Sequence, residues 1–73
     1  MRKCRITVVS LPDRENLVAE ISYDGFQFAE ISQETGQLMI QFYRHPNKEF
    51  WGFSLEEFQK IVEKAKQKLI EIG

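Results

Sequence analysis

The chain has 73 residues, of which 42% are hydrophobic, and its formal net charge is −1. This length predicts one domain over residues 1–73 with a small core, and the near-neutral charge provides no long-range field that would attract nucleic acid or an anionic membrane. The single cysteine, Cys4, excludes an internal disulfide and fits a reducing compartment. The sequence contains neither a signal-peptide pattern nor an apolar run of the roughly 20 residues that span a bilayer. We therefore expect a cytoplasmic protein without a membrane partner.

Alternation of polar and apolar residues through the first two thirds of the chain predicts β-strands. The predicted strands cover residues 2–10, 17–22, 26–32 and 37–43, and residues 49–53 fit either a short fifth strand or a loop. Polar segments at 11–16 and 44–48 interrupt the alternation and are predicted loops. In the first strand Cys4, Ile6 and Val8 share one face.

The tetrapeptide Ala-Glu-Ile-Ser occurs on both sides of Asp24-Gly25, and this turn signal predicts a β-hairpin. A two-residue loop would place Ala19 opposite Glu30 and mix apolar with charged side chains on one face. A three-residue loop over 23–25 places Ala19 opposite Ala29, with Gly25 as its left-handed residue. We therefore expect the three-residue loop.

The next turn extends this register to a third and a fourth strand. A four-residue loop over 33–36 places Ile31 opposite Leu38 and Ala29 opposite Ile40. One face of the meander then consists of apolar residues, namely Leu17, Ala19, Ile21, Ala29, Ile31, Leu38, Ile40 and Phe42. Because a slip of one residue would turn all of these away from the core, we expect this face to be the buried one.

The last third of the chain changes to a helical period. Its apolar residues fall on one side of a helix and are Leu55, Phe58, Ile61, Val62, Ala65, Leu69 and Ile72. Ser54 and Glu57 form a capping box at the start of this helix, and Phe53 and Phe58 occupy the positions of a hydrophobic staple. The predicted fold class is therefore α+β: an antiparallel β-meander of four to five strands packed in two layers on one C-terminal α-helix.

The predicted helix is narrower than the predicted sheet. Five strands spaced at about 4.8 Å are roughly 20 Å wide, whereas a helix with its side chains is about 10 Å wide. The helix would leave the flank with Cys4, Ile6 and Val8 uncovered unless the sheet curls around it. Otherwise a second subunit must cover this flank, so we expect a homodimer that forms through the sheet and not through the exposed lysine stripe of the helix, which consists of Lys60, Lys64 and Lys68.

The residue types that carry catalysis do not converge in this sequence. His45, the only histidine, lies in a loop with no nucleophile nearby in the sequence. Cys4 alternates in phase with apolar residues, which predicts a buried thiol and not a reactive one. One cysteine and one histidine do not supply four zinc ligands, and the four glycines are isolated from one another. We expect no enzyme and no catalytic, cofactor-binding or metal-binding residues.

The second face of the predicted sheet is unusually rich in aromatic and apolar residues for a solvated surface. By the same register it carries a predicted partner-binding set, which consists of Glu20, Phe26, Phe28, Glu30, Met39 and Tyr43. A contiguous apolar patch of this kind is typical of a binding surface. In the alternative interpretation, Phe26 and Tyr43 cover each other across the strands and shield one end of the hairpin.

The stretch from Val18 to Tyr43, together with His45-Pro46-Asn47 and the helix start at Ser54-Leu55-Glu56-Glu57, resembles a group of small uncharacterised bacterial proteins in which a β-meander precedes a C-terminal helix. HicB-type antitoxins are similar in their architecture, in a strand like Ala19-Glu20-Ile21 and in the helix start. Pur-type and Whirly-type single-stranded nucleic-acid binders are similar in architecture only. The resemblance implies the fold and no activity.

Two functions from different classes follow as expectations. The first is a non-enzymatic protein-interaction module of immunity-protein or antitoxin type, whose partner is a protein such as a toxin. In this interpretation Glu20 and Glu30 take the place of nucleic-acid phosphates and Phe28, Met39 and Tyr43 are apolar anchors. The alternative is a sheet that binds single-stranded nucleic acid by stacking bases on its aromatic residues. The net charge of −1 disfavours nucleic acid.

Overall fold

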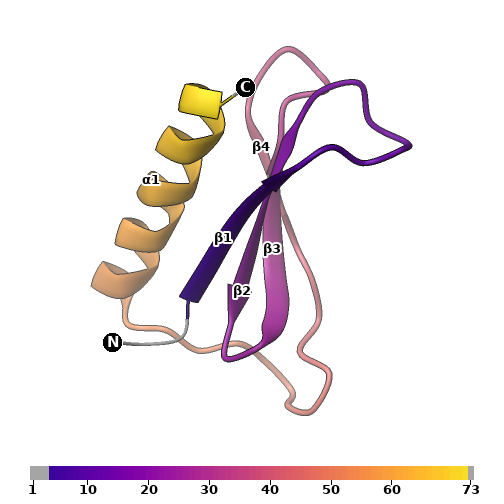
Figure 1. Cartoon of the computed structure of the whole chain (residues 1–73). Helices are drawn as coiled ribbons and strands as arrows, with labels where there is room; N and C mark the ends of the chain where they lie inside the picture. Colours follow the sequence, from indigo (N-terminus) through magenta and orange to yellow (C-terminus); the bar gives the residue numbers. More distant parts are fainter. Residues whose placement is uncertain (1–3, 73) are drawn as a thin grey trace.

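The computed structural model describes residues 4–72, which form a four-stranded antiparallel sheet and one helix (Figure 1). The strands lie in chain order: β1 (Cys4–Val9), β2 (Val18–Tyr23), β3 (Phe26–Ser32) and β4 (Met39–Phe42). The helix α1 (Leu55–Ile72) packs on one face of the sheet. The predicted α+β class, antiparallel meander and C-terminal helix are confirmed. Residues 49–53 form a loop, so the part of the chain that the structure describes has four strands and not five.

The hairpin between β2 and β3 turns through two residues, not three. Tyr23 pairs directly with Phe26, and the two residues between them, Asp24 and Gly25, have φ angles of 52° and 89°. Positive φ at both central positions is the geometry of the tight hairpin turn that Asp-Gly favours. The predicted three-residue loop is therefore wrong.

A β-bulge lies one step beyond this turn, on β3. Ser22 pairs with Gln27 and the preceding residue, Ile21, pairs with Ala29, so that Phe28 is an extra residue on β3. A bulge places two residues of one strand opposite one residue of its partner and changes the face on which the following side chains lie. After the bulge, the alternate apolar residues Ala29 and Ile31 therefore lie on the face of the sheet that packs against α1.

The strand pairs differ from the predicted pairs by two residues. Ala19 pairs with Ile31 and not with Ala29, and Ile31 pairs with Ile40 and not with Leu38. Because side chains alternate with a period of two, a shift of two residues keeps each of them on its predicted face. The predicted pairs are wrong, whereas the predicted shared face of these residues is kept. The expectation that this whole face is buried is wrong for Leu38, Ile40 and Phe42, which are exposed.

The core lies between α1 and the helix-facing side of the sheet. Its buried residues are Ala19, Ile21, Phe28, Ala29, Ile31, Ile61, Ala65 and Leu69. The predicted apolar stripe of the helix is buried only along its middle, and Leu55 and Ile72 at its ends are exposed. The reason is length, because 18 helical residues extend about 27 Å whereas the six-residue strands extend about 20 Å.

The predicted N-cap of the helix is present. The Ser54 hydroxyl oxygen accepts a hydrogen bond from the backbone N–H of Glu57 at 3.0 Å. The staple residues Phe53 and Phe58 are in contact, with ring centroids 6.1 Å apart. The serine satisfies one of the backbone donors that the first helical turn leaves without an intrahelical partner.

Replacing this cap should weaken the fold measurably. Ser54→Ala is expected to lower the free energy of unfolding by about 1 kcal/mol, because the N–H of Glu57 loses its side-chain acceptor. Urea denaturation followed by circular dichroism measures the loss, with the exposed Ser10→Ala as the matched control. Equal midpoints for both variants would contradict a stabilising cap.

Candidate functional site

The bulge removes two aromatic residues from the predicted binding face. Phe26 pairs directly with Tyr23, and directly opposed residues share a face. Tyr23 packs against the core, so this is the helix-facing side. Phe28 is 1% exposed, and its ring lies 4.8 Å from that of Phe53 and 5.5 Å from that of Trp51, centroid to centroid. The prediction that Phe26 and Phe28 lie on the opposite face is therefore wrong.

Glu30 lies on the predicted face but is buried beneath its own partners. The residue as a whole is 2% exposed. The Tyr43 hydroxyl donates to Oε1 at 2.6 Å, and Nη2 of Arg14, from the β1–β2 loop, lies 2.6 Å from Oε2. The bond to Glu30, together with burial, raises the pKa of Tyr43 to about 12. The negative charge of Glu30 is neutralised inside the protein, so the carboxylate is not presented to solvent as a phosphate mimic.

Two loops close over the same side of the sheet. The Glu34 carboxylate, from the β3–β4 loop, accepts hydrogen bonds from the backbone N–H groups of Glu15 and Asn16, both at 2.9 Å. These bonds lower the pKa of Glu34. Val18 points to this side by strand alternation and is fully buried. Part of the predicted binding face is thus occupied by the protein's own loops.

The remaining members of the predicted partner-binding set do not form one surface. Glu20 is half-buried, Met39 is 46% exposed and Phe26 is 38% exposed. The Phe26 ring lies 5.4 Å from that of His45, at the hairpin end. The structure brings Glu30 and Tyr43 together, pairs Glu20 directly with Glu30 on the same face, and places Phe26 and Phe28 on the other face.

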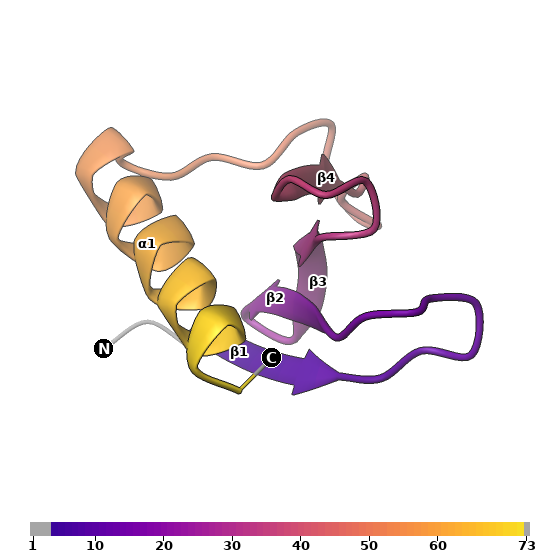
Figure 2. The same cartoon turned by 90° about the horizontal axis from the view of Figure 1, so that it is seen from above.

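The largest run of exposed apolar side chains belongs to β4 and the residue before it. By strand alternation Leu38 (37% exposed), Ile40 (37%) and Phe42 (57%) share one face, which we call the β4 surface, whereas Met39 (46%) points to the opposite face. The cause is the position of α1, which packs mainly against β1 and β2 and leaves β4 at the far side of the curled sheet (Figure 2). Phe58 reaches from the helix toward this surface, with its ring 6.2 Å from that of Phe42.

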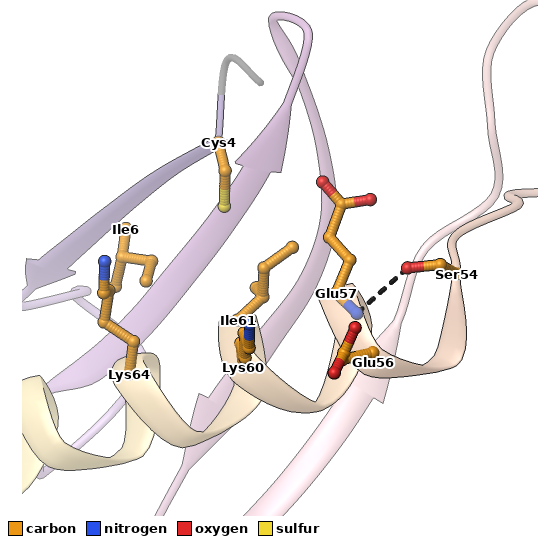
Figure 3. Close-up of a pocket in the computed structure, with 8 residues that line it drawn as sticks. All are labelled: Cys4, Ile6, Ser54, Glu56, Glu57, Lys60, Ile61 and Lys64. Atoms are coloured by element: carbon orange, nitrogen blue, oxygen red, sulfur yellow. Dashed lines mark hydrogen bonds between the residues drawn. The ribbon is translucent and has the colours of Figure 1, made fainter. Parts of the chain in front are cut away.

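The opposite edge of the sheet borders a groove between β1 and the first half of α1 (Figure 3). This β1–α1 groove has a volume of about 630 Å³ and is lined by Cys4, Ile6, Ser54, Glu56, Glu57, Lys60, Ile61 and Lys64. Cys4 is half-buried, not buried as expected. Burial raises the pKa of its thiol, the charge of Lys64 lowers it, and the charge of Glu57 raises it; the net direction is upward. Cys4, Ile6 and Val8 are half-buried and pack against the core, so the prediction that the helix leaves this flank uncovered is wrong, and the uncovered strand is β4.

Two residues shape the segment between β4 and α1. The Nδ1 atom of His45 accepts hydrogen bonds from the backbone N–H groups of Asn47 and Lys48, at 3.0 and 3.1 Å. The indole N–H of Trp51 donates to the carbonyl oxygen of Tyr43 at 2.9 Å. Trp51 had no assigned role in the sequence prediction. The signal that could have found it is the local density of aromatic residues between positions 50 and 53.

Over residues 4–72, no group of three or more histidine, cysteine or acidic side chains is placed to hold a metal ion. The helix within this range is not long and apolar enough to cross a membrane. The chain matches no protein-family model, no curated protein and no solved structure.

Proposed function

We propose that the protein is a non-enzymatic protein-interaction module, of antitoxin or immunity-protein type, which docks on a partner protein through the β4 surface. The observation that carries the proposal is the exposure of Leu38, Ile40 and Phe42 along one face of the β4 strand. Scattered apolar residues on a protein surface need no explanation, but a contiguous group of them marks an interaction site. The predicted interaction function is kept, and its surface moves from the second face to the edge strand β4.

The β4 surface has the features of a docking site with a central anchor. Phe42 is the most exposed apolar residue of the strand at 57%, and Phe58 lies beside it on the helix. Leu55, one helical turn before Phe58, is also exposed, at 71%. Aromatic side chains at the centre of an interface carry much of its binding energy. A partner that packs here would cover apolar surface that α1 leaves open.

A matched pair of variants tests this proposal. Phe42→Glu should abolish partner binding because it places a charge at the centre of the surface, whereas Phe50→Glu makes the same change at a phenylalanine that is 73% exposed and lies outside it. Affinity capture from host cells should retain the same partner with the wild type and Phe50→Glu and lose it with Phe42→Glu.

In isolation, the β4 surfaces of two copies should cover each other, so sedimentation should show a homodimer for the wild type and Phe50→Glu and a monomer for Phe42→Glu.

Two results would count against the proposal. The first is a set of captured proteins that does not change when Phe42 is replaced. The second is equal loss of binding in the two variants, because binding would then respond to added charge and not to the β4 surface. If the wild type sediments as a monomer at about 100 µM, the homodimer is refuted and the interaction with a partner protein is not. A specific interface with either would need to bury on the order of 1,000 Å².

A further inference from the structure

A second cavity lies between the end of the β2–β3 hairpin and the segment that joins β4 to α1. Its volume is about 250 Å³. We call it the aromatic pocket because five rings line it, those of Tyr23, Phe26, His45, Phe50 and Trp51. Sites for drug-sized ligands have volumes of roughly 300–1,000 Å³. The aromatic pocket therefore suits a smaller molecule.

The rings of this pocket are held by contacts with one another and with the backbone. The His45 ring lies 4.3 Å from that of Trp51 and 5.4 Å from that of Phe26, centroid to centroid. The indole N–H of Trp51 is fixed by the carbonyl oxygen of Tyr43. Because Nδ1 of His45 accepts two backbone hydrogen bonds, it carries no proton and the imidazole ring is neutral. The wall of the pocket is thus preorganised, and His45 adds no charge to it.

Two exposed side chains of opposite charge complete the lining. Asp24 comes from the hairpin turn, and Lys48 comes from the segment after β4. The pocket lies between these two segments, so it has a carboxylate on one border and an ammonium group on the other. The faces of aromatic rings attract cations, above all quaternary ammonium groups. A ligand that carries a cationic and an anionic group matches all three features of this lining.

We propose that the aromatic pocket binds a small zwitterion in which a trimethylammonium group is joined to a carboxylate. The methyl groups pack on the rings, and the positive charge is attracted by the rings and by Asp24. The carboxylate of the ligand faces Lys48. A ligand with a cationic group alone is repelled by Lys48, and an uncharged planar ligand uses the rings but neither charge.

This site is separate from the docking site of the proposed function. The aromatic pocket and the β4 surface share no residue. Phe42→Glu, which should abolish docking on the β4 surface, should therefore leave binding of the zwitterion unchanged. The two proposals can fail independently of each other.

Three ligands of related shape test the inference on the wild-type protein. Trp51 is the only tryptophan of the chain and lines the pocket, so its fluorescence reports binding. Glycine betaine should give a saturable change at constant ionic strength. Tert-butylacetate has the same shape and carboxylate but a carbon atom in place of the charged nitrogen, so it should bind about tenfold more weakly. Choline lacks the carboxylate and should also bind more weakly than glycine betaine.

Two variants separate the charges of the pocket. Asp24→Asn removes the carboxylate and keeps a residue that tolerates the positive φ of the turn. It should weaken the binding of glycine betaine and of choline, each about threefold. Lys48→Gln should weaken glycine betaine by a similar factor but not choline, because choline has no carboxylate. Asp13→Asn and Lys66→Gln make the same charge changes at exposed positions outside the pocket and should bind like the wild type.

Three results would overturn the inference. The first is the absence of a saturable change with glycine betaine up to about 10 mM. The second is equal binding of glycine betaine and tert-butylacetate, because shape alone would then decide binding. The third is an equal loss of glycine betaine and choline binding in Lys48→Gln. The comparison of ligands uses the wild type, so it remains decisive if a variant does not fold.

Discussion

Phe28→Ala is expected to lower the free energy of unfolding by about 3–5 kcal/mol, the usual cost of removing a buried phenylalanine ring. Phe28 is 1% exposed, and its ring contacts those of Trp51 and Phe53. A chain of this length has a total stability of roughly 4–11 kcal/mol. The substitution should therefore remove a large fraction of the stability, and the variant should show a much lower urea midpoint or be unfolded without denaturant.

Phe50→Ala is the matched control for this prediction. Phe50 is 73% exposed, so removing its ring should change the free energy of unfolding by no more than about 0.5 kcal/mol. Urea denaturation of both variants, followed by circular dichroism, makes the comparison. If Phe28→Ala were as stable as Phe50→Ala, the Phe28 ring would lie outside the core and the bulge on β3 would be wrong.

The second large effect is expected at alkaline pH, from the bond between Tyr43 and Glu30. The pKa of Tyr43 is raised from 10.0 to about 12, first because its hydroxyl donates to the Glu30 carboxylate and second because it is partly buried. A group with a raised folded-state pKa contributes stability that is complete below its unfolded-state pKa. This contribution should be present below pH 10 and should be lost progressively as the pH rises to about 12.

Tyr43→Phe isolates this contribution. At about pH 9 the variant should be less stable than the wild type by roughly 1.5 kcal/mol, the low end for a hydrogen bond to a charged group, because the pair is partly exposed. The difference between the two proteins should shrink as the pH rises, since ionised tyrosine no longer donates. Urea denaturation at several alkaline pH values measures it, and a constant difference over this range would contradict the role of the Tyr43 proton.

Local sequence patterns determined the elements of this fold and most of their faces. Alternation over short segments placed the four strands, because a strand with one buried face must repeat every two residues. The capping serine at Ser54 and the helical period after it placed α1, since both signals act within one or two turns of the chain. Asp24-Gly25 likewise placed the hairpin, because only residues that tolerate positive φ suit that turn.

The β-bulge was decided by tertiary structure. One extra residue at Phe28 changes no local composition, and what favours it is the burial of that ring against Trp51 and Phe53, more than twenty positions along the chain. Alternation applied without the bulge places Phe26 and Phe28 on the wrong face. Because of this single unpaired residue, the predicted aromatic patch does not form on the second face of the sheet.

The burial of Glu30 and the exposure of β4 also depended on contacts between segments that are distant in the sequence. Glu30 is buried because Arg14 and Tyr43, from two other parts of the chain, supply its charge partner and its hydrogen-bond donor. The sequence by itself showed that one helix is too narrow for the sheet, but it contained no signal for which strands the helix would cover. Packing of Ile61, Ala65 and Leu69 over β1 and β2 decided this, and it left β4 exposed as the candidate docking surface and a groove beside β1.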